Sequence, residues 1–101
     1  MTAYYIALLR VHDRETYERY VADVLPLILR HGGRVLAADY APRWLEGPRD
    51  ADRVVLLAFE DPDSARRLFE SAEYQSLAEN RRRASESSVL CVQGLDPGAD
   101  R

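Results

Sequence analysis

The sequence predicts an α+β domain of the ferredoxin-like type, in which a four-stranded antiparallel sheet carries helices on one face. Two observations lead to this fold class. Strand-like and helical segments follow one another in the order β-α-β-β-α-β. In addition, the strands at residues 3–11 and 53–60 are apolar at successive positions and do not alternate with polar residues. Such strands are buried on both faces, so we expect both faces of the sheet to be covered.

The first strand is expected over residues 3–11, and the helix after it is expected to begin at Asp13. The Asp13 carboxylate can accept the free backbone N–H groups of the first helical turn. Gly32 is expected to end the helix in a left-handed turn. Apolar side chains at helical spacing predict the buried stripe of this helix: Tyr17, Val21, Val24, Leu25 and Ile28.

The second strand is predicted over residues 34–40, where the pair Ala41-Pro42 interrupts it. Residues 44–47 are expected to resume it as an edge segment, because edges and bulges tolerate proline. The third strand, residues 53–60, is closed by charged residues at both ends.

Asp61 and Pro62 predict the start of the second helical region, as N-cap and first-turn proline. Ser71 is expected to break this region and to cap a further helix. Residues 85–88 are expected to be weakly helical, and residues 88–93 to form the last strand. The buried side of the region is expected to comprise Ala65, Leu68, Phe69, Ala72, Tyr74, Leu77, Ala78 and Arg81.

The chain of 101 residues is expected to form a single domain over residues 1–94, followed by a disordered tail at 95–101. Its net charge of −3 disfavours non-specific binding to nucleic acid. Cys91, the one cysteine, excludes an internal disulfide. No apolar run is long enough to cross a membrane, so a cytoplasmic location without a membrane partner is expected.

A single copy of this fold leaves one face of its sheet without a covering layer. An apolar sheet face in water exceeds the patch size that monomers usually tolerate. Packing the bare faces of two copies together covers both, and a two-fold dimer is the commonest arrangement. The sequence therefore predicts a homodimer, arranged as a dimeric α/β barrel.

Several short pieces, in their order and spacing, resemble the domain of unknown function 1330 family. They are YERY at 17–20, LPL at 25–27, GGR at 32–34, LEG at 45–47, RVVLL at 53–57, SAEYQ at 71–75 and Gly94. The resemblance covers about residues 3–94 and implies a dimeric α/β barrel without an established reaction. Related dimeric α/β-barrel families include cofactor-independent monooxygenases, muconolactone isomerases and haem-handling enzymes, which is an analogy of fold alone.

A ligand pocket is expected between sheet and helices, with Asp39, Arg53, Tyr74 and Arg81 as its polar groups. Arg81 follows Tyr74 by seven residues on the apolar stripe, so it points inward. A buried guanidinium needs a carboxylate or a ligand anion. The alternative to a ligand is a structural ion pair of Arg81 with one of three acids: Glu73, Asp39 or Glu46.

Asp39 is the candidate catalytic residue. If it is buried, its raised pKa suits a general base. The alternative is an ion pair with Arg53 on the neighbouring strand, which would hold it ionised and structural. Tyr4 and Tyr5 are expected on opposite faces of the sheet, one below the helices and one in the dimer interface.

No metal and no cofactor is expected. His12 and His31 are isolated from each other and from Cys91, without a metal-ligand spacing. Cys91 is expected to be an inert, buried thiol between apolar neighbours. No nucleophile elbow, P-loop or dinucleotide-binding glycine motif is present in the sequence.

Three hypotheses for the function follow, and the sequence leaves open whether the protein is an enzyme. The first is a homodimeric small-molecule-binding protein with a pocket between sheet and helices. The second is a cofactor-independent oxygenase or isomerase that acts on a small aromatic or keto compound. The third is a structural or regulatory dimer without a ligand.

Overall fold

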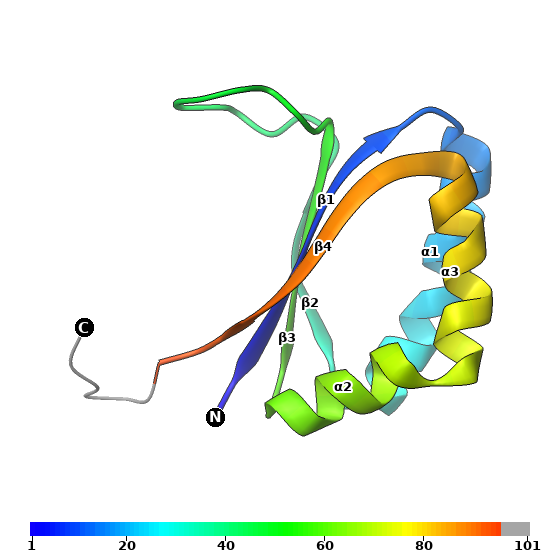
Figure 1. Cartoon of the computed structure of the whole chain (residues 1–101), viewed down its shortest axis with the longest axis vertical. Helices are drawn as coiled ribbons and strands as arrows, with labels where there is room; N and C mark the ends of the chain where they lie inside the picture. Colours follow the sequence, from blue (N-terminus) through cyan, green and yellow to red (C-terminus); the bar gives the residue numbers. More distant parts are fainter. Residues whose placement is uncertain (96–101) are drawn as a thin grey trace.

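The computed structural model describes residues 1–95 and has the predicted ferredoxin-like fold. The strands run antiparallel in the order β2-β3-β1-β4, and all helices cover one face of the sheet (Figure 1). The elements are β1 (Ala3–Val11), α1 (Arg14–Arg30), β2 (Arg34–Asp39), β3 (Arg53–Phe59), α2 (Pro62–Glu70), α3 (Ala72–Ala84) and β4 (Ser85–Gln93). Among residues 1–95, no helix is both long and apolar enough to span a bilayer.

Strand β1 is central and fixes which side chains reach the helices. Tyr5 lies opposite Leu57 of β3 and Cys91 of β4. Because side chains alternate between the faces of a strand, Tyr5 and Leu9 point to the helices while Tyr4 points to the other face. The prediction that Tyr4 and Tyr5 lie on opposite faces is thus confirmed.

Helix α1 has the predicted ends. The Asp13 carboxylate accepts the N–H group of Thr16 at 3.1 Å, and Gly32 has the left-handed φ of 78°. The next N–H group, of Gly33, bonds back to the carbonyl of Ile28 at 2.9 Å, which closes the last turn. The predicted stripe is partly wrong, because Leu25 is 38% exposed.

The buried face of α1 consists of Tyr17, Tyr20, Val24, Leu27 and Ile28.

The second helical region divides at Ser71, as predicted. Asp61 accepts the N–H group of Ser64 at 2.7 Å and so caps α2. The Ser71 hydroxyl accepts from Tyr74 N–H at 3.1 Å and caps α3. Ala72, predicted to be buried, is exposed, because α2 ends at Glu70 and the chain changes direction before α3 begins.

Two segments differ from the sequence predictions. Residues 44–47 form no edge strand, since pairing of β2 with β3 ends at Asp39 and residues 40–52 leave the sheet as a loop (Figure 1). Pro42 lacks an N–H group, and Gly47 turns the chain with a φ of 86°. Residues 85–88 are not helical but begin β4, because they pair with β1.

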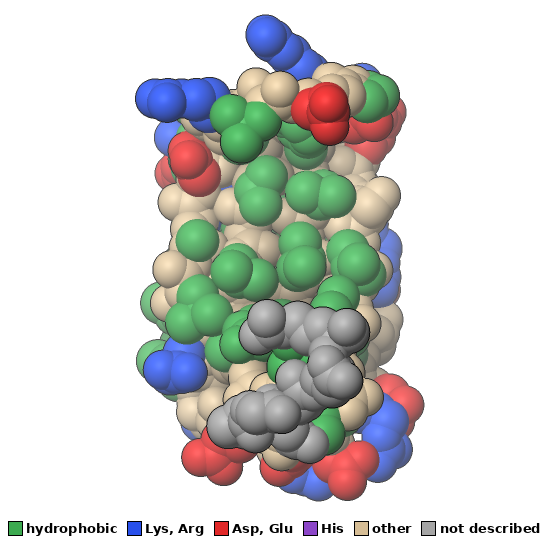
Figure 2. Space-filling view, turned by 90° about the vertical axis from the view of Figure 1, so that its left-hand side faces the viewer, with side chains coloured by type: hydrophobic (Ala, Val, Ile, Leu, Met, Phe, Trp, Pro, Cys, Tyr) green, Lys and Arg blue, Asp and Glu red, His purple; other side chains and the backbone are tan. Residues whose placement is uncertain are grey.

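The face of the sheet opposite the helices is called the open face below. Its centre is apolar, and charged side chains lie at its two ends (Figure 2). In β4, Leu90 is 43% exposed and Val92 41% exposed. The large apolar side chains that the register places there are Tyr4, Ile6 and Leu8 of β1, Val54 and Leu56 of β3, and Leu90 and Val92 of β4. Of the predicted tail, residues 96–101 lie outside the described residues.

Candidate functional site

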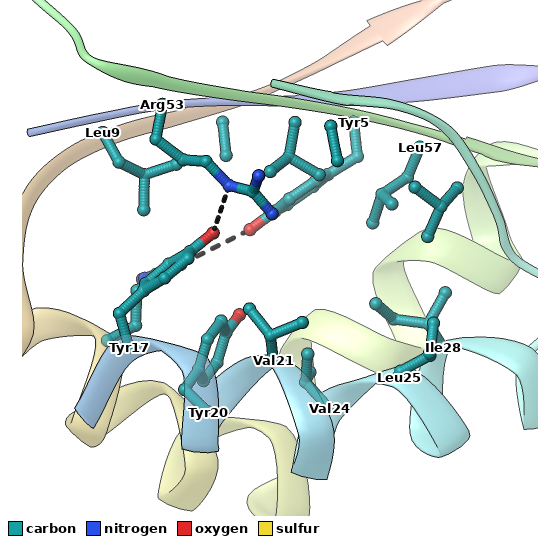
Figure 3. A pocket seen from close by; sticks show the side chains of 15 residues that line it. Tyr5, Leu9, Tyr17, Tyr20, Val21, Val24, Leu25, Ile28, Arg53 and Leu57 are labelled. Atoms are coloured by element: carbon teal, nitrogen blue, oxygen red, sulfur yellow. Dashed lines mark hydrogen bonds between the residues drawn. The ribbon is translucent and has the colours of Figure 1, made fainter. Parts of the chain in front are cut away.

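A cavity of about 370 Å³ lies between the sheet and α1 (Figure 3). Its walls come from alternate residues of β1 and β3, from two residues of β2 on either side of its register shift, from the inner side of α1 and from one residue of α3. The lining side chains are Tyr5, Ala7, Leu9, Tyr17, Tyr20, Val21, Val24, Leu25, Ile28, Val35, Ala38, Arg53, Val55, Leu57 and Arg81.

The polar groups gather at one end of the cavity. Figure 3 shows Arg53 with the hydroxyl ends of Tyr5 and Tyr17 on one side, and Leu57 and Ile28 on the other. Within residues 1–95, no carboxylate or imidazole belongs to the lining. The cavity is therefore apolar along most of its length and carries positive charge at one end.

Arg53, the first residue of β3, is only 8% exposed, and its guanidinium points into the cavity (Figure 3). Its Nε donates to the hydroxyl of Tyr17 at 3.3 Å. Its Cζ lies 4.1 Å from the centre of the Tyr40 ring, a cation–π distance. Within residues 1–95, its terminal nitrogens donate no hydrogen bond to protein and no acid pairs with it.

Arg81 of α3 is 7% exposed and is held by tyrosine hydroxyls. Its Nη1 donates to Tyr74 Oη at 3.1 Å and to Tyr5 Oη at 3.4 Å. Its buried Nε has no hydrogen-bond partner among residues 1–95. Burial by itself lowers the pKa of Arg81, but the surrounding tyrosines, Tyr74 first, outweigh it and raise that pKa, so the group stays cationic.

The tyrosines at this end are neutral hydrogen-bonding groups. Burial, followed by the effect of Tyr74, raises the pKa of Tyr5 and that of Tyr20 well above the usual tyrosine value. Tyr5 Oη and Tyr74 Oη are also 2.9 Å apart and share a hydrogen bond. Tyr5 and Tyr20 therefore stay protonated near neutral pH and can donate hydrogen bonds.

The four residues proposed from the sequence do not form one cluster. Arg53 and Arg81 line the cavity, while Tyr74 lies behind its wall and bonds Arg81. Asp39 is exposed and outside the cavity, where its carboxylate accepts the N–H group of Ala41 at 2.8 Å. It ends β2 opposite Val54, on the side of the open face, whereas its neighbour Ala38 faces the cavity.

The predicted structural ion pairs are absent from residues 1–95. Neither Asp39 nor any other acid pairs with Arg53, and the proposed partner of Arg81, Glu73, pairs with Arg30 at 2.9 Å. Cys91, predicted to be buried, is exposed, because it lies on the edge strand β4. Among residues 1–95, no three His, Cys, Asp or Glu side chains lie close enough together to hold a metal ion.

The sequence reasoning missed Tyr17 and Tyr20 as site residues. Tyr17 was predicted only as part of the buried stripe of its helix. Their signal is the spacing of three residues, which puts both on one helix face. The centres of their rings are 6.0 Å apart. Arg53 Cζ lies 5.6 Å from the centre of the Tyr17 ring, and Arg81 Cζ lies 5.8 Å from the centre of the Tyr20 ring. The two tyrosines thus lie between the two arginines.

Together, these features define a ferredoxin-like α+β protein with a cavity between sheet and helices. The chain matches the family model described as "Domain of unknown function (DUF1330)" over residues 2–95, and it belongs to this family. The resemblance drawn from the sequence is thereby confirmed. No curated protein matches the chain in sequence.

Three solved structures show the same fold at low sequence identity. RPA0582, a protein of unknown function from Rhodopseudomonas palustris, is 21% identical, with a TM-score of 0.76 over 95% of this chain and 84% of that one. SnoaB, a cofactor-independent oxygenase from Streptomyces nogalater, is 18% identical, with a TM-score of 0.68 and 95% of each chain covered. HapK from Hahella chejuensis is 17% identical, with a TM-score of 0.62 and 98% of each chain covered.

Proposed function

We propose that this protein binds a small organic molecule in the cavity between the sheet and α1. The observation that carries the proposal is the cavity itself, about 370 Å³ in volume and apolar except for arginine and tyrosine groups at one end. Ligand sites in proteins typically have about 300–1,000 Å³, with mostly apolar walls and a few polar groups that orient the ligand.

Binding is favoured over catalysis by the absence of a base among the lining residues. Proton abstraction needs a group that accepts a proton near neutral pH. In the described part of the chain, the lining holds no carboxylate or imidazole, and the raised pKa values of Tyr5 and Tyr20 make their phenolates scarce. Asp39, the candidate base from the sequence, lies outside the cavity. The likeness to SnoaB supports the fold and carries no argument for oxygenase activity.

We also propose that two copies of the chain pack through their open faces. The open face has an apolar centre between charged ends (Figure 2), as a buried interface core with a polar rim requires. The loop of residues 40–52 projects from one end of the sheet on the side away from the helices (Figure 1). In a two-fold dimer through the open faces, this loop of each copy would lie beside the other copy. This favours a second copy of the chain as the partner that covers the open face.

Ligand binding is tested with N-phenyl-1-naphthylamine, a neutral apolar dye whose fluorescence rises in an apolar cavity. We expect saturable binding that Ala38→Trp blocks, because Ala38 lines the cavity and an indole there would fill it. The matched control is Ala22→Trp, at an exposed position of α1 outside the lining. Equal binding to both variants would show that the dye sits elsewhere and would contradict the proposal.

A further inference from the structure

Among residues 1–95, the two cavity arginines are buried cations without an acidic partner. Elsewhere among residues 1–95, Arg14, Arg30 and Arg66 form ion pairs, and all three are on the surface. Arg53 and Arg81 are buried, yet no acid within residues 1–95 pairs with either. Buried charges in proteins are normally paired, since burial removes their hydration.

The protein groups around these arginines do not replace such a partner. The Tyr40 and Tyr17 rings attract the Arg53 cation, but a ring face accepts no strong hydrogen bond from the terminal N–H groups. Tyr17 Oη accepts from Arg53 Nε, which leaves its own proton free to be donated. Arg81 Nε still lacks an acceptor within residues 1–95.

The polar end of the cavity thus presents hydrogen-bond donors in excess of acceptors. Guanidinium N–H groups can only donate, and the Tyr17 hydroxyl, which accepts from Arg53 Nε, has its own proton free to donate. A head group that fits this end must accept several hydrogen bonds and carry negative charge. A carboxylate meets both conditions and matches the planar fork of an arginine.

The remaining walls of the cavity determine the chemical character of the ligand beyond its head group. Beyond the arginines, its wall consists of aliphatic side chains from α1 and the sheet, among them Val24, Ile28 and Leu57 (Figure 3). A second charge on the ligand would have no partner there. We infer that the ligand is a monocarboxylate with an apolar body, its head group at Arg53 and Arg81 and its body between α1 and the sheet. This inference rests on the proposed binding function and adds the chemical class of the ligand.

The test compares two probes that differ only in head group, octanoate and octanamide, as competitors of bound N-phenyl-1-naphthylamine. Both have the same flexible chain, so shape affects them equally. We expect octanoate to displace the dye at a concentration at least about tenfold lower than octanamide does, because the acid alone forms charge-assisted hydrogen bonds. Arg53→Gln should weaken octanoate about tenfold and leave octanamide within about twofold.

The control variant is Arg66→Gln, at an exposed arginine of α2 outside the cavity, which should keep the preference for octanoate. Equal displacement by the two probes in the unaltered protein would overturn the inference and leave the binding function standing. If the dye does not bind in the cavity and neither probe displaces it, the proposed binding function itself would be overturned. An octanoate preference that survives in both Arg53→Gln and Arg81→Gln would also overturn the inference, because the head group would then lie elsewhere.

Discussion

Arg81 Nη1 lies 3.1 Å from the hydroxyl oxygen of Tyr74, two turns earlier on the same helix, and both side chains are buried. The same nitrogen lies 3.4 Å from Tyr5 Oη on the central strand. The contact therefore ties α3 to β1 through a charge that has no acid partner among residues 1–95. Burial removes the hydration of this charge, and the ligand site that Arg81 forms is the reason we propose for its presence.

Arg81→Met is expected to stabilise the ligand-free protein. Methionine fills a similar volume, needs no hydrogen bond and leaves Tyr5 and Tyr74 bonded to each other. Removing a buried donor that lacks a partner should raise the free energy of unfolding by about 1–3 kcal/mol. Urea unfolding at one fixed protein concentration measures this change.

The control for this variant is Arg82→Met, because Arg82 is the exposed neighbour on α3. It should change the free energy of unfolding by less than about 0.5 kcal/mol. A loss of stability in Arg81→Met would mean that its tyrosine contacts outweigh the cost of the buried charge, and that Arg81 is a structural anchor.

Tyr74→Phe should have the opposite effect. It removes the oxygen that accepts from Arg81 and pairs with Tyr5, while the ring that packs 5.1 Å from Phe69 remains. The guanidinium would lose its better acceptor, so the expected cost is about 1–3 kcal/mol of unfolding free energy. Tyr4→Phe on the open face is the matched control, since the Tyr4 hydroxyl bonds no protein group within residues 1–95. Equal effects of the two substitutions in thermal unfolding would exclude a special role for the Tyr74 hydroxyl.

Much of the fold follows from signals that are local in the sequence. Asp13, Asp61 and Ser71 cap helices through their own side chains, so their roles can be read without tertiary structure. Residues 85–88 could not be placed in this way. They are polar and have no strand pattern, and they become part of β4 because β1 supplies hydrogen-bond partners from a distant part of the chain.

The site was only partly predictable for the same reason. The helical spacing from Tyr74 indicates that Arg81 points inward, and the structure buries it. The position of Asp39 depends on an irregularity between Val35 and Ala37 in the pairing of β2 with β3, which alters the facing of the residues after it. The sequence does not disclose that shift, so it could not show that Ala38 and not Asp39 faces the cavity.

Stability should fall at alkaline pH because of Tyr5 and Tyr20. Burial raises the pKa of both in the folded state above the unfolded value of 10.0. The folded state therefore holds these protons more tightly, and the resulting stability is fully present below pH 10 and is lost as pH rises above it. Each tyrosine contributes a slope of at most about 1.4 kcal/mol per pH unit.

Urea unfolding between pH 8 and pH 11 measures this slope, in steps of about half a unit around the tyrosine pKa. Tyr5→Phe should reduce the slope, because one of the two protons is no longer present in either state. Absorbance at the wavelength of tyrosinate should show that these side chains ionise only when the protein unfolds. A stability that stays constant through pH 11 would contradict the buried, neutral state of both hydroxyls.

Ile6→Glu should separate the proposed dimer into monomers. Ile6 lies at the middle of the open face, between Leu56 of β3 and Leu90 of β4 in the strand register. In a face-to-face dimer, the two-fold axis would bury two new carboxylates without partners, a cost of several kcal/mol per charge. The helices, the core and the cavity are on the other side of the sheet, so the variant should remain folded.

Sedimentation equilibrium at micromolar concentration should give a dimer for the unaltered protein and a monomer for Ile6→Glu. The control Ala22→Glu, at an exposed position of α1, should also give a dimer. A monomeric unaltered protein would refute the proposed pairing through the open face, and a dimeric Ile6→Glu variant would place the interface elsewhere.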